Sequence, residues 1–247
     1  MTCLEKDFPV MVHLSVDSTT NQPFLSNADV ETLMSRVSEF FEPICMSFSA
    51  CEINIIDNYT FHNVVDASRF REMRILFGKP RRINIFILGT IPNEECGTST
   101  FYGIDREQGE YIFLETDGCD DSLEGQLAHH LGHYFGLSDT YRGNDVEIVN
   151  DLNCAVVSDS ICDTPTDPFG RFLGSAGNYV DPEGQLIDMT EFLSDCEFTH
   201  ELKDPNDEYY QPQVGNIMSA YPCRCGFTNG QFQKIIDNYN SATHRPY

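Results

Sequence analysis

The segment His129–Asp139, which reads H-H-L-G-H-Y-F-G-L-S-D, combines residue types and spacings that could bind a metal ion. On an α-helix, His129 and His133 project from one face, one turn apart, as a single tetrahedral Zn²⁺ requires. Gly136 follows where the helix must stop and turn, because glycine readily adopts a positive φ. We expect the turn to bring Asp139 back as a third ligand. Three protein ligands leave one position open for water or substrate, which is typical of a catalytic zinc site.

His130 stands beside the first histidine, where the helix motif H-E-x-x-H has a glutamate. In zinc proteases that glutamate takes a proton from the attacking water and passes it to the leaving amine. An imidazole carries no fixed negative charge near neutral pH and has a different reach, so we expect His130 to replace the carboxylate poorly. Loss of a general base typically costs about 10²–10⁴-fold in rate. The predicted metal ligands are intact, as in a deliberately inactivated protease or in a natural pseudoenzyme.

Length and composition bound the fold. The chain has 247 residues, 40% of them hydrophobic, which suits one domain or two lobes around a cleft. No apolar run approaches the roughly 20 residues needed to cross a bilayer, and the first residues lack the apolar core of a signal peptide. We expect a secreted protein from which a leader has been removed.

Ten cysteines suit an oxidised extracellular protein better than a reduced cytosolic one. Their number is even, which suits disulfides but leaves the pairing open. The alternative is a structural zinc cluster that begins at Cys223-Arg224-Cys225, although C-x-C lacks the usual gap of two to four residues and has no matching second pair. We favour disulfides. The cysteines stand at positions 3, 45, 51, 96, 119, 154, 162, 196, 223 and 225.

The formal net charge of -24 argues against a nucleic-acid partner, because phosphate backbones are bound by concentrated lysine and arginine. A solvated acidic surface is the simplest interpretation. Two alternatives are that some carboxylates bind Ca²⁺ and that some attract peptides with basic side chains.

The elements that must position the histidines alternate between strand and helix in the first half of the chain. Apolar periodicity predicts strands at Pro9–Val16 and Met46–Ile56 and a buried central strand at Ile83–Leu88. Between them we expect two helices, one capped by Ser26 or Asn27 and one capped by Asp66 that carries Phe70, Met73 and Leu76 on one side. This order favours a mostly parallel, twisted sheet.

Two further strands are expected just before the histidine helix, at residues 98–102 and 111–115. One of them would form a sheet edge on which an extended peptide could be laid by backbone hydrogen bonds, with Ser99, Thr100 and Phe101 as substrate-binding residues.

Beyond Asp139 the character of the sequence changes. Residues 142–215 are rich in Asp, Asn, Gly, Pro and Ser and have few periodic apolar positions, so this segment needs disulfides more than a core. A final helix from Thr228 carries apolar residues at helical spacing, namely Phe232, Ile235, Ile236 and Tyr239.

Three motifs in this order resemble the metzincin clan of zinc endopeptidases, and within it the pappalysin-like (cytophagalysin) group. The first is the helix with His129, His133, Gly136 and Asp139, which departs from the clan's pattern at His130. The second, Asn216-Ile217-Met218-Ser219, is similar to the Met-turn, in which a methionine packs beneath the metal ligands. The third, residues 159–165, resembles a calcium-binding segment of the group and implies Asp159 and Thr164 as Ca²⁺ ligands, with a simple Asx turn as the alternative.

The resemblance implies an α+β fold of the metzincin type in a single catalytic domain. A twisted, mixed five-stranded sheet with helices would form an upper lobe over residues 1–136. An irregular, disulfide-stapled lower lobe with a C-terminal helix would span residues 137–247, below a substrate cleft. A tyrosine two residues after the Met-turn methionine stabilises the reaction intermediate in related proteins. Position 220 is alanine here, so Tyr221 is the nearest candidate.

The expected function is zinc-dependent hydrolysis of peptide bonds in proteins by a secreted enzyme, strongly impaired in this chain by His130. The alternative is a pseudoprotease that binds a peptide or protein in the cleft, with His130 as an additional metal ligand. A third hypothesis is a structural module that binds no metal. His13, His62 and His200 are interpreted as ordinary histidines rather than ligands.

Overall fold

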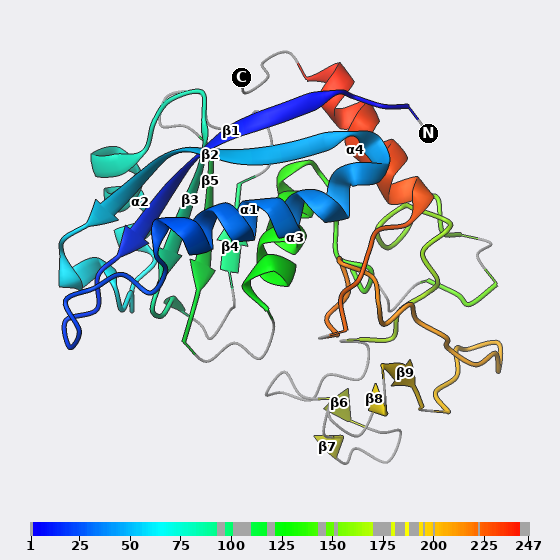
Figure 1. Ribbon diagram of the computed structural model, residues 1–247. Helices are drawn as coiled ribbons and strands as arrows, with labels where there is room; N and C mark the ends of the chain where they lie inside the picture. Colours follow the sequence, from blue (N-terminus) through cyan, green and yellow to red (C-terminus); the bar gives the residue numbers. More distant parts are fainter. Residues whose placement is uncertain are drawn as a thin grey trace. The chain divides into compact units, whose positions relative to one another are not determined.

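Five strands from the first half of the chain pair into one sheet in the computed structural model, in the order β2-β1-β3-β5-β4 (Figure 1). The strands are β1 (Lys6–Ser15), β2 (Met46–Ile56), β3 (Ile83–Leu88), β4 (Gly97–Ser99) and β5 (Glu110–Glu115). The pairs β1/β2, β1/β3 and β3/β5 are parallel, and β4 runs antiparallel to β5. The predicted mixed five-stranded sheet and α+β class are therefore confirmed, with β3 as the central strand.

The structure describes residues 2–92, 97–100, 110–117, 122–142, 147–150, 153–169, 179–180, 186–187, 193–194, 196–199, 201–221 and 223–242. Its α-helices are α1 (Asn27–Phe41), α2 (Ser68–Phe77), α3 (Leu123–Tyr134) and α4 (Asn229–Ser241), and its 3-10 helices are η1 (Glu42–Ile44) and η2 (Tyr59–Phe61). Four two-residue strands form two small antiparallel pairs, β6 (Tyr179–Val180) with β7 (Leu186–Ile187) and β8 (Leu193–Ser194) with β9 (Glu197–Phe198). Each described helix is too short or too polar to span a bilayer.

Strand bounds at Met46–Ile56 and Ile83–Leu88 are those predicted, whereas β1 begins at Lys6 instead of Pro9. Proline lacks the N–H that a central strand needs, which made Pro9 a natural first residue. In the structure β3 pairs only with Met11–Leu14, so residues 6–9 have a neighbouring strand on one side alone. A proline is tolerated at such a position.

Helix starts show one correct and one wrong prediction. Ser26 caps α1 as predicted, in a reciprocal capping box with Asp29. Asp66 does not occupy the cap of α2, which is Ala67, although its carboxylate accepts a hydrogen bond from the Ser68 N–H at 2.8 Å. Leu76 was also expected on the buried side of α2 but is 58% exposed, because α2 is short and buries mainly Met73.

An aromatic cluster fills the sheet face that carries α1 and α3. Phe8 on β1 lies 5.6 Å from Phe48, 5.5 Å from Phe135 and 5.7 Å from Tyr239, measured between ring centroids. Phe41 at the end of α1 joins the same cluster. Full burial of one such side chain contributes about 1.5–3 kcal/mol, so this cluster ties α1, α3, α4 and the sheet together.

The opposite face packs against α2. Phe86 on β3 stacks between His13 and Phe113, and Phe113 stacks on Phe70 of α2. Met73 of α2 is fully buried in the same core. Helices therefore lie on both faces of the sheet, which explains why all six residues of β3 are buried.

The chain divides into two compact units. The first unit comprises residues 1–136 and 233–247, and the second comprises residues 137–232. The first contains the five-stranded sheet, α1, α2 and α3. The second contains the four short strands, and its other described residues form mainly turns and bends. An irregular segment was predicted for this part of the chain.

Three disulfides join described cysteines, and their pairing could not be read from the sequence. Cys3–Cys45 lies in the first unit, and Cys154–Cys162 and Cys196–Cys223 lie in the second. Because Cys223 is in a disulfide, it cannot be the nucleus of a second zinc cluster. Cys51 and Cys225 are free and exposed.

Candidate metal centre

Helix α3 carries the three histidines and is anchored at its start by Ser122. The Ser122 hydroxyl accepts a hydrogen bond from the Gly125 N–H at 3.2 Å, which satisfies one of the unpaired donors at the helix end. Leu127, Ala128 and Leu131 are fully buried, and α3 packs against α1, β4 and β5. Packing against three elements holds the backbone of the histidines in place (Figure 1).

The end of α3 is fixed by a turn at Gly136 and by its neighbours. Gly136 has φ +91°, as predicted for the residue that ends this helix. A Cβ added there would also lie 2.3 Å from Nδ2 of Asn238, and this amide donates to the carbonyl oxygen of Phe135 at 2.8 Å. The Tyr134 hydroxyl donates to the carboxylate of Glu110 on β5. Both ends of α3 are therefore constrained.

Three imidazoles, those of His129, His130 and His133, come together on α3. One ligand atom from each lies within 4.8 Å of the others, and this is the sole group of at least three His, Cys, Asp or Glu residues with metal-binding geometry in the described part of the chain. His129 and His130 are each 8% exposed, and the rings of His129 and His133 are 4.5 Å apart. Nitrogen ligands around tetrahedral zinc lie about 3.3 Å apart, so the three ligand atoms would move closer together when they bind one ion. The donor set fits zinc.

The imidazole of His130 packs against Gly97 of the edge strand β4, which leaves no room for a side chain at position 97. A Cβ added to Gly97 would lie 2.2 Å from Nε2 of His130 and 2.8 Å from the Phe113 carbonyl oxygen. Gly97 was not predicted as a site residue, because the expected strand began at residue 98, whereas β4 begins at Gly97. A glycine in a strand is a signal of close approach by another group. The imidazole at the position of the expected glutamate is therefore accommodated by the backbone beside it.

Asp139 belongs to the second unit, so its role as the third zinc ligand stays a prediction. Within that unit it lies beside Tyr141 and Asp167. Burial raises the pKa of Tyr141, and the charges of Asp139 and Asp167 and a hydrogen bond with Asp139 raise it further, while Arg224 opposes them. Tyr141 is therefore a neutral hydrogen-bond donor near the Asp139 carboxylate.

Asp167 is the centre of a buried polar network that was not predicted from the sequence. Its carboxylate accepts hydrogen bonds from the Tyr221 hydroxyl at 3.0 Å, the Thr140 hydroxyl at 2.8 Å and the Phe169 N–H at 3.0 Å. Burial raises its pKa, and these three hydrogen bonds oppose that shift. In a chain with 39 acidic residues, nothing in the sequence marks this one. Tyr221 is fully buried and bound to Asp167, and its catalytic role stays a prediction.

Met218 lies in a tight turn, where the resemblance placed the Met-turn. The Ser219 N–H donates to the Asn216 carbonyl at 3.1 Å, and the Met218 N–H donates to the Asn216 side chain at 2.8 Å. Asn216 is paired in turn with Gln231 through two side-chain hydrogen bonds of 3.0 Å. The Met218 side chain is fully buried in the second unit.

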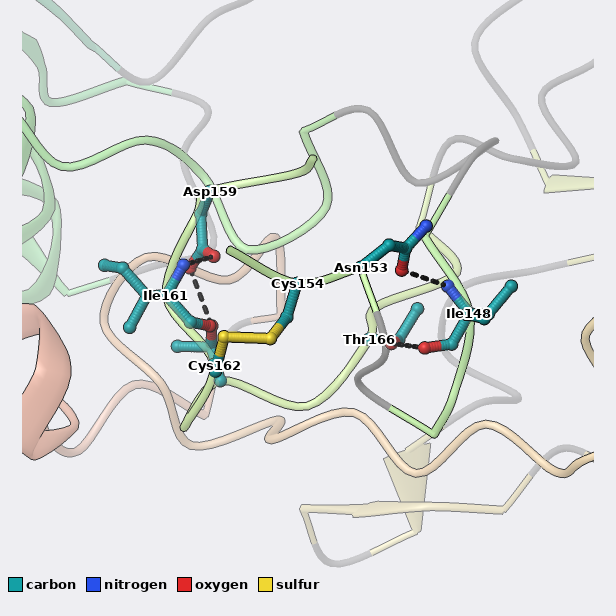
Figure 2. Close-up of a disulfide and its surroundings, with 8 residues drawn as sticks. Ile148, Asn153, Cys154, Asp159, Ile161, Cys162 and Thr166 are labelled. Carbon is teal, nitrogen blue, oxygen red and sulfur yellow. Dashed lines mark hydrogen bonds between the residues drawn. A yellow bond between two sulfur atoms is a disulfide. The ribbon is translucent and has the colours of Figure 1, made fainter. Parts of the chain in front are cut away.

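The calcium prediction gains no support from the loop that contains Asp159 and Thr164 (Figure 2). One Asp159 oxygen accepts from the Ile161 N–H at 2.9 Å, and the other accepts from the Thr164 hydroxyl at 2.8 Å. Both oxygens thus stabilise the turn beside the Cys154–Cys162 disulfide. These contacts form an Asx turn, the alternative interpretation of this segment, and calcium binding by Asp159 and Thr164 stays a prediction.

The predicted substrate strand is the sheet edge. In β4, Ser99 pairs with Ile112 of β5, and the Thr100 N–H donates to the Tyr111 carbonyl at 3.0 Å. The other side of β4 has no strand neighbour in the described sheet. Phe101 lies outside the described residues, and peptide binding at Ser99 and Thr100 stays a prediction.

Two of the histidines interpreted as ordinary are held in the first unit by hydrogen bonds. His13 contacts Asn84 at 3.3 Å and Asn54 at 3.2 Å, and His62 contacts the Ser15 hydroxyl at 2.9 Å. His13 lies in β1, and His62 follows η2. His200 lies outside the described residues.

No family model matches the chain, and a search of the curated proteins finds no match either. Among solved structures, metalloproteinase-II from Bacteroides fragilis is similar with a TM-score of 0.38 and 11% identity, over 56% of this chain and 45% of that one. A chaperone–substrate complex is similar with a TM-score of 0.35 and 12% identity, over 56% of this chain and 25% of that one. The chain thus covers less than half of either protein, and likenesses this slight carry no assignment.

Proposed function

We propose that this chain is a zinc-binding, metalloendopeptidase-type domain whose own capacity to cut peptides is strongly reduced. The single observation that carries the proposal is the group formed by His129, His130 and His133 on one buried helix. Its spacing is that of a zinc-protease helix, and its middle member replaces the general base. The ordered motifs at His129–Asp139 and Asn216–Ser219 support the metzincin clan and its pappalysin-like group.

Each residue has a distinct proposed role. His129 and His133 hold the zinc, and Asp139 provides the third ligand. When bound, zinc supplies a Lewis acid for the scissile carbonyl and the attacking water. The open edge of β4 at Ser99 orients an extended peptide by backbone hydrogen bonds, and Thr100, whose N–H is bonded to the Tyr111 carbonyl, lines the same edge through its side chain. His130 stands where proton transfer is needed, and an imidazole held against Gly97 is a poor base there.

A second function, metal-dependent binding without cleavage, is favoured by the place of His130 in the histidine group. One of its ring nitrogens lies within 4.8 Å of the ligand atoms offered by His129 and His133. In this function His130 is an additional zinc ligand and closes the open coordination position. The disulfides support an extracellular setting for either function.

Restoring the base tests the first function. The variant His130→Glu is expected to cleave a denatured protein in a zinc-dependent manner at least 10²-fold faster than the parent chain. Cleavage should stop with a chelator and return with added zinc. His130→Gln is the matched control, because it has the same length as glutamate but no charge.

Metal analysis separates the outcomes. One zinc per chain together with cleavage by His130→Glu supports the peptidase function. One zinc per chain without cleavage across a broad peptide library contradicts it and leaves the binding function. Absence of stoichiometric zinc from protein purified without added metal contradicts both. Loss of affinity in His130→Gln identifies His130 as a ligand.

A further inference from the structure

Positive charge is concentrated in one short segment of an acidic chain. Residues 69–82 contain six of the fifteen lysines and arginines and a single acidic residue, while the whole chain carries a net charge of -24. Three of the six, Lys79, Arg81 and Arg82, stand within four residues. None of these three forms an ion pair with a carboxylate among the described residues. The metal centre uses no part of this segment.

The three cationic residues line a cavity of about 500 Å³ in the first unit. Its other walls include Met11 on β1 and Cys51 and Glu52 on β2. A volume of this size is within the range of small-molecule sites. Three positive charges against the one carboxylate of Glu52 make the cavity attractive to anions.

The loop that carries the cations is held by a buried side chain. Asn84, 1% exposed, accepts from the Lys79 N–H at 2.8 Å, and its amide nitrogen lies 2.9–3.0 Å from the carbonyl oxygens of Lys79 and Arg82. Arg81, between them, has φ +62°, a left-handed conformation that is uncommon outside glycine. Both ends of the loop are therefore fixed on β3, which reduces the ordering cost when a ligand binds.

An irregularity in the sheet forms the other wall. The β1/β2 register pairs Val10 with Ala50 and Met11 with Glu52, so Cys51 is the extra residue of a β-bulge. The Cys51 thiol remains exposed, 3.2 Å from the Val10 carbonyl oxygen. The bulge directs Cys51 and Glu52 to the cavity beside the cationic loop.

We propose that this cavity is a binding site for a small organic anion that carries a phosphate or sulfate group. Arg81 and Arg82 present guanidinium groups, which match the oxygens of such groups, and Lys79 adds a compact charge. Glu52 accepts a hydrogen bond from a hydroxyl or amine elsewhere on the ligand. The site is independent of the zinc centre and of the proposed function.

Two free cysteines among the described residues, Cys51 and Cys225, allow a comparison within one molecule. Iodoacetate is anionic and iodoacetamide is neutral, so the ratio of their rates at a thiol reports the local attraction of anions. Peptide mass spectrometry of one reaction reads Cys51 and the exposed Cys225 of the second unit separately. The iodoacetate/iodoacetamide ratio is expected to be roughly tenfold higher at Cys51.

Charge-neutral variants locate the effect. Lys79→Gln and Arg82→Gln should each lower the ratio at Cys51 about threefold, and together they should abolish the preference. Arg71→Gln, which removes the same charge from the exposed surface of α2, is the matched control and should leave it unchanged. Because both reagents attack the same thiolate, changes in its accessibility or reactivity cancel in the ratio.

Inorganic phosphate and sulfate, added at constant ionic strength, are the two ligand probes. Saturable protection of Cys51 from iodoacetate by either one supports the site, and the more effective probe identifies the group that it recognises. Equal ratios at Cys51 and Cys225 overturn the proposal. The proposal is also overturned if Arg71→Gln lowers the ratio at Cys51 as much as Arg82→Gln does. It is overturned as well if neither anion gives saturable protection of Cys51.

Discussion

The two units of this protein hold their backbones by different means. In the first, a mostly parallel sheet is packed on both faces by helices, and aromatic rings such as Phe8 and Phe86 fill the interior. In the second, the described residues are held by disulfides and by polar side chains that bond to turns, as at Asp159, Asp167 and Asn216. Burial stabilises the first unit, and specific polar contacts fix the second.

This difference matters for the metal centre. The three histidines lie on a helix that packs against α1, β4 and β5, so packing energy restricts where α3 can move. Asp139 and Met218 lie in the second unit, where positions depend on individual hydrogen bonds such as that from the Thr140 N–H to the Met218 carbonyl at 3.0 Å. Mutations should therefore affect the histidines through packing and affect Asp139 through polar networks.

Truncation of Phe8 should produce the largest effect and tests whether packing dominates the first unit. Phe8→Ala removes ring contacts with Phe48, Phe135 and Tyr239 and leaves a cavity between the sheet and α3. We expect the free energy of unfolding to fall by about 3–5 kcal/mol, as measured by urea denaturation. A loss below 1 kcal/mol would contradict the view that packing stabilises the first unit, because the aromatic cluster would then contribute little.

Acid should weaken the first unit through His13. Burial lowers the pKa of His13 to about 4 from 6.5, with the Lys79 charge acting in the same direction and the Asn84 hydrogen bond opposing it. The unfolded chain therefore binds more protons between pH 6.5 and 4, so the free energy of unfolding decreases as the pH falls through this range. The decrease from this residue amounts to about 3 kcal/mol.

The measurement compares the wild type with His13→Gln in urea denaturation at pH 7.5 and at pH 4. Glutamine does not titrate, so the stability advantage of the wild type should shrink by about 3 kcal/mol at the lower pH. Parallel pH profiles for the two proteins would contradict the neutral, buried state of His13.

Removal of the Cys154–Cys162 disulfide should loosen the second unit selectively. The bridge closes a loop with a sequence separation of 8, and the double variant Cys154→Ser with Cys162→Ser should lose about 2–3 kcal/mol. Hydrogen exchange should quicken at the Ile161 amide, which lies in that loop, and at the Thr164 amide just beyond it, and stay slow in β3. Equal acceleration in both units would show that they unfold together, and it would contradict the separate stabilisation of the two units.

Sequence patterns predicted the first unit well because burial imposes periodicity. The strands at Met46–Ile56 and Ile83–Leu88 were recognised from apolar residues alone. The pattern was wrong at Leu76, where a helix of ten residues presents an apolar side chain to solvent. Periodicity indicates which residues are suited to burial, whereas the extent of the surface that a helix packs against determines which residues are buried.

The second unit was predictable only as irregular. Its disulfide partners and the Asp167 network depend on contacts between distant residues, such as Asp167 with Tyr221, and such contacts leave no local spacing in the sequence. For the candidate site, the motif identified His129 and His133 as ligands because helical spacing places them on one face, and it identified His130 as the residue that replaces the glutamate. It could not identify Gly97, because strand pairing brings that residue beside His130.

Substitution of Gly97 should give the smallest of these effects and tests the contact between β4 and His130. A Cβ at Gly97 would lie 2.2 Å from Nε2 of His130, so Gly97→Ala should lower stability by about 2 kcal/mol and displace the imidazole. The Phe113 carbonyl, 2.8 Å from the same Cβ, accounts for part of this cost. The His130→Ala background separates the two contributions, since only the clash with the imidazole is then relieved.

In that double-mutant cycle, Gly97→Ala should cost about 1 kcal/mol less in the His130→Ala background than in the wild type. Zinc affinity provides a second readout. If His130 is a ligand, Gly97→Ala lowers the affinity in the wild-type background and leaves it unchanged when His130 is absent. Additive stability effects would mean that His130 turns away from β4 at no cost, and the edge strand would then have no influence on the histidine that replaces the base.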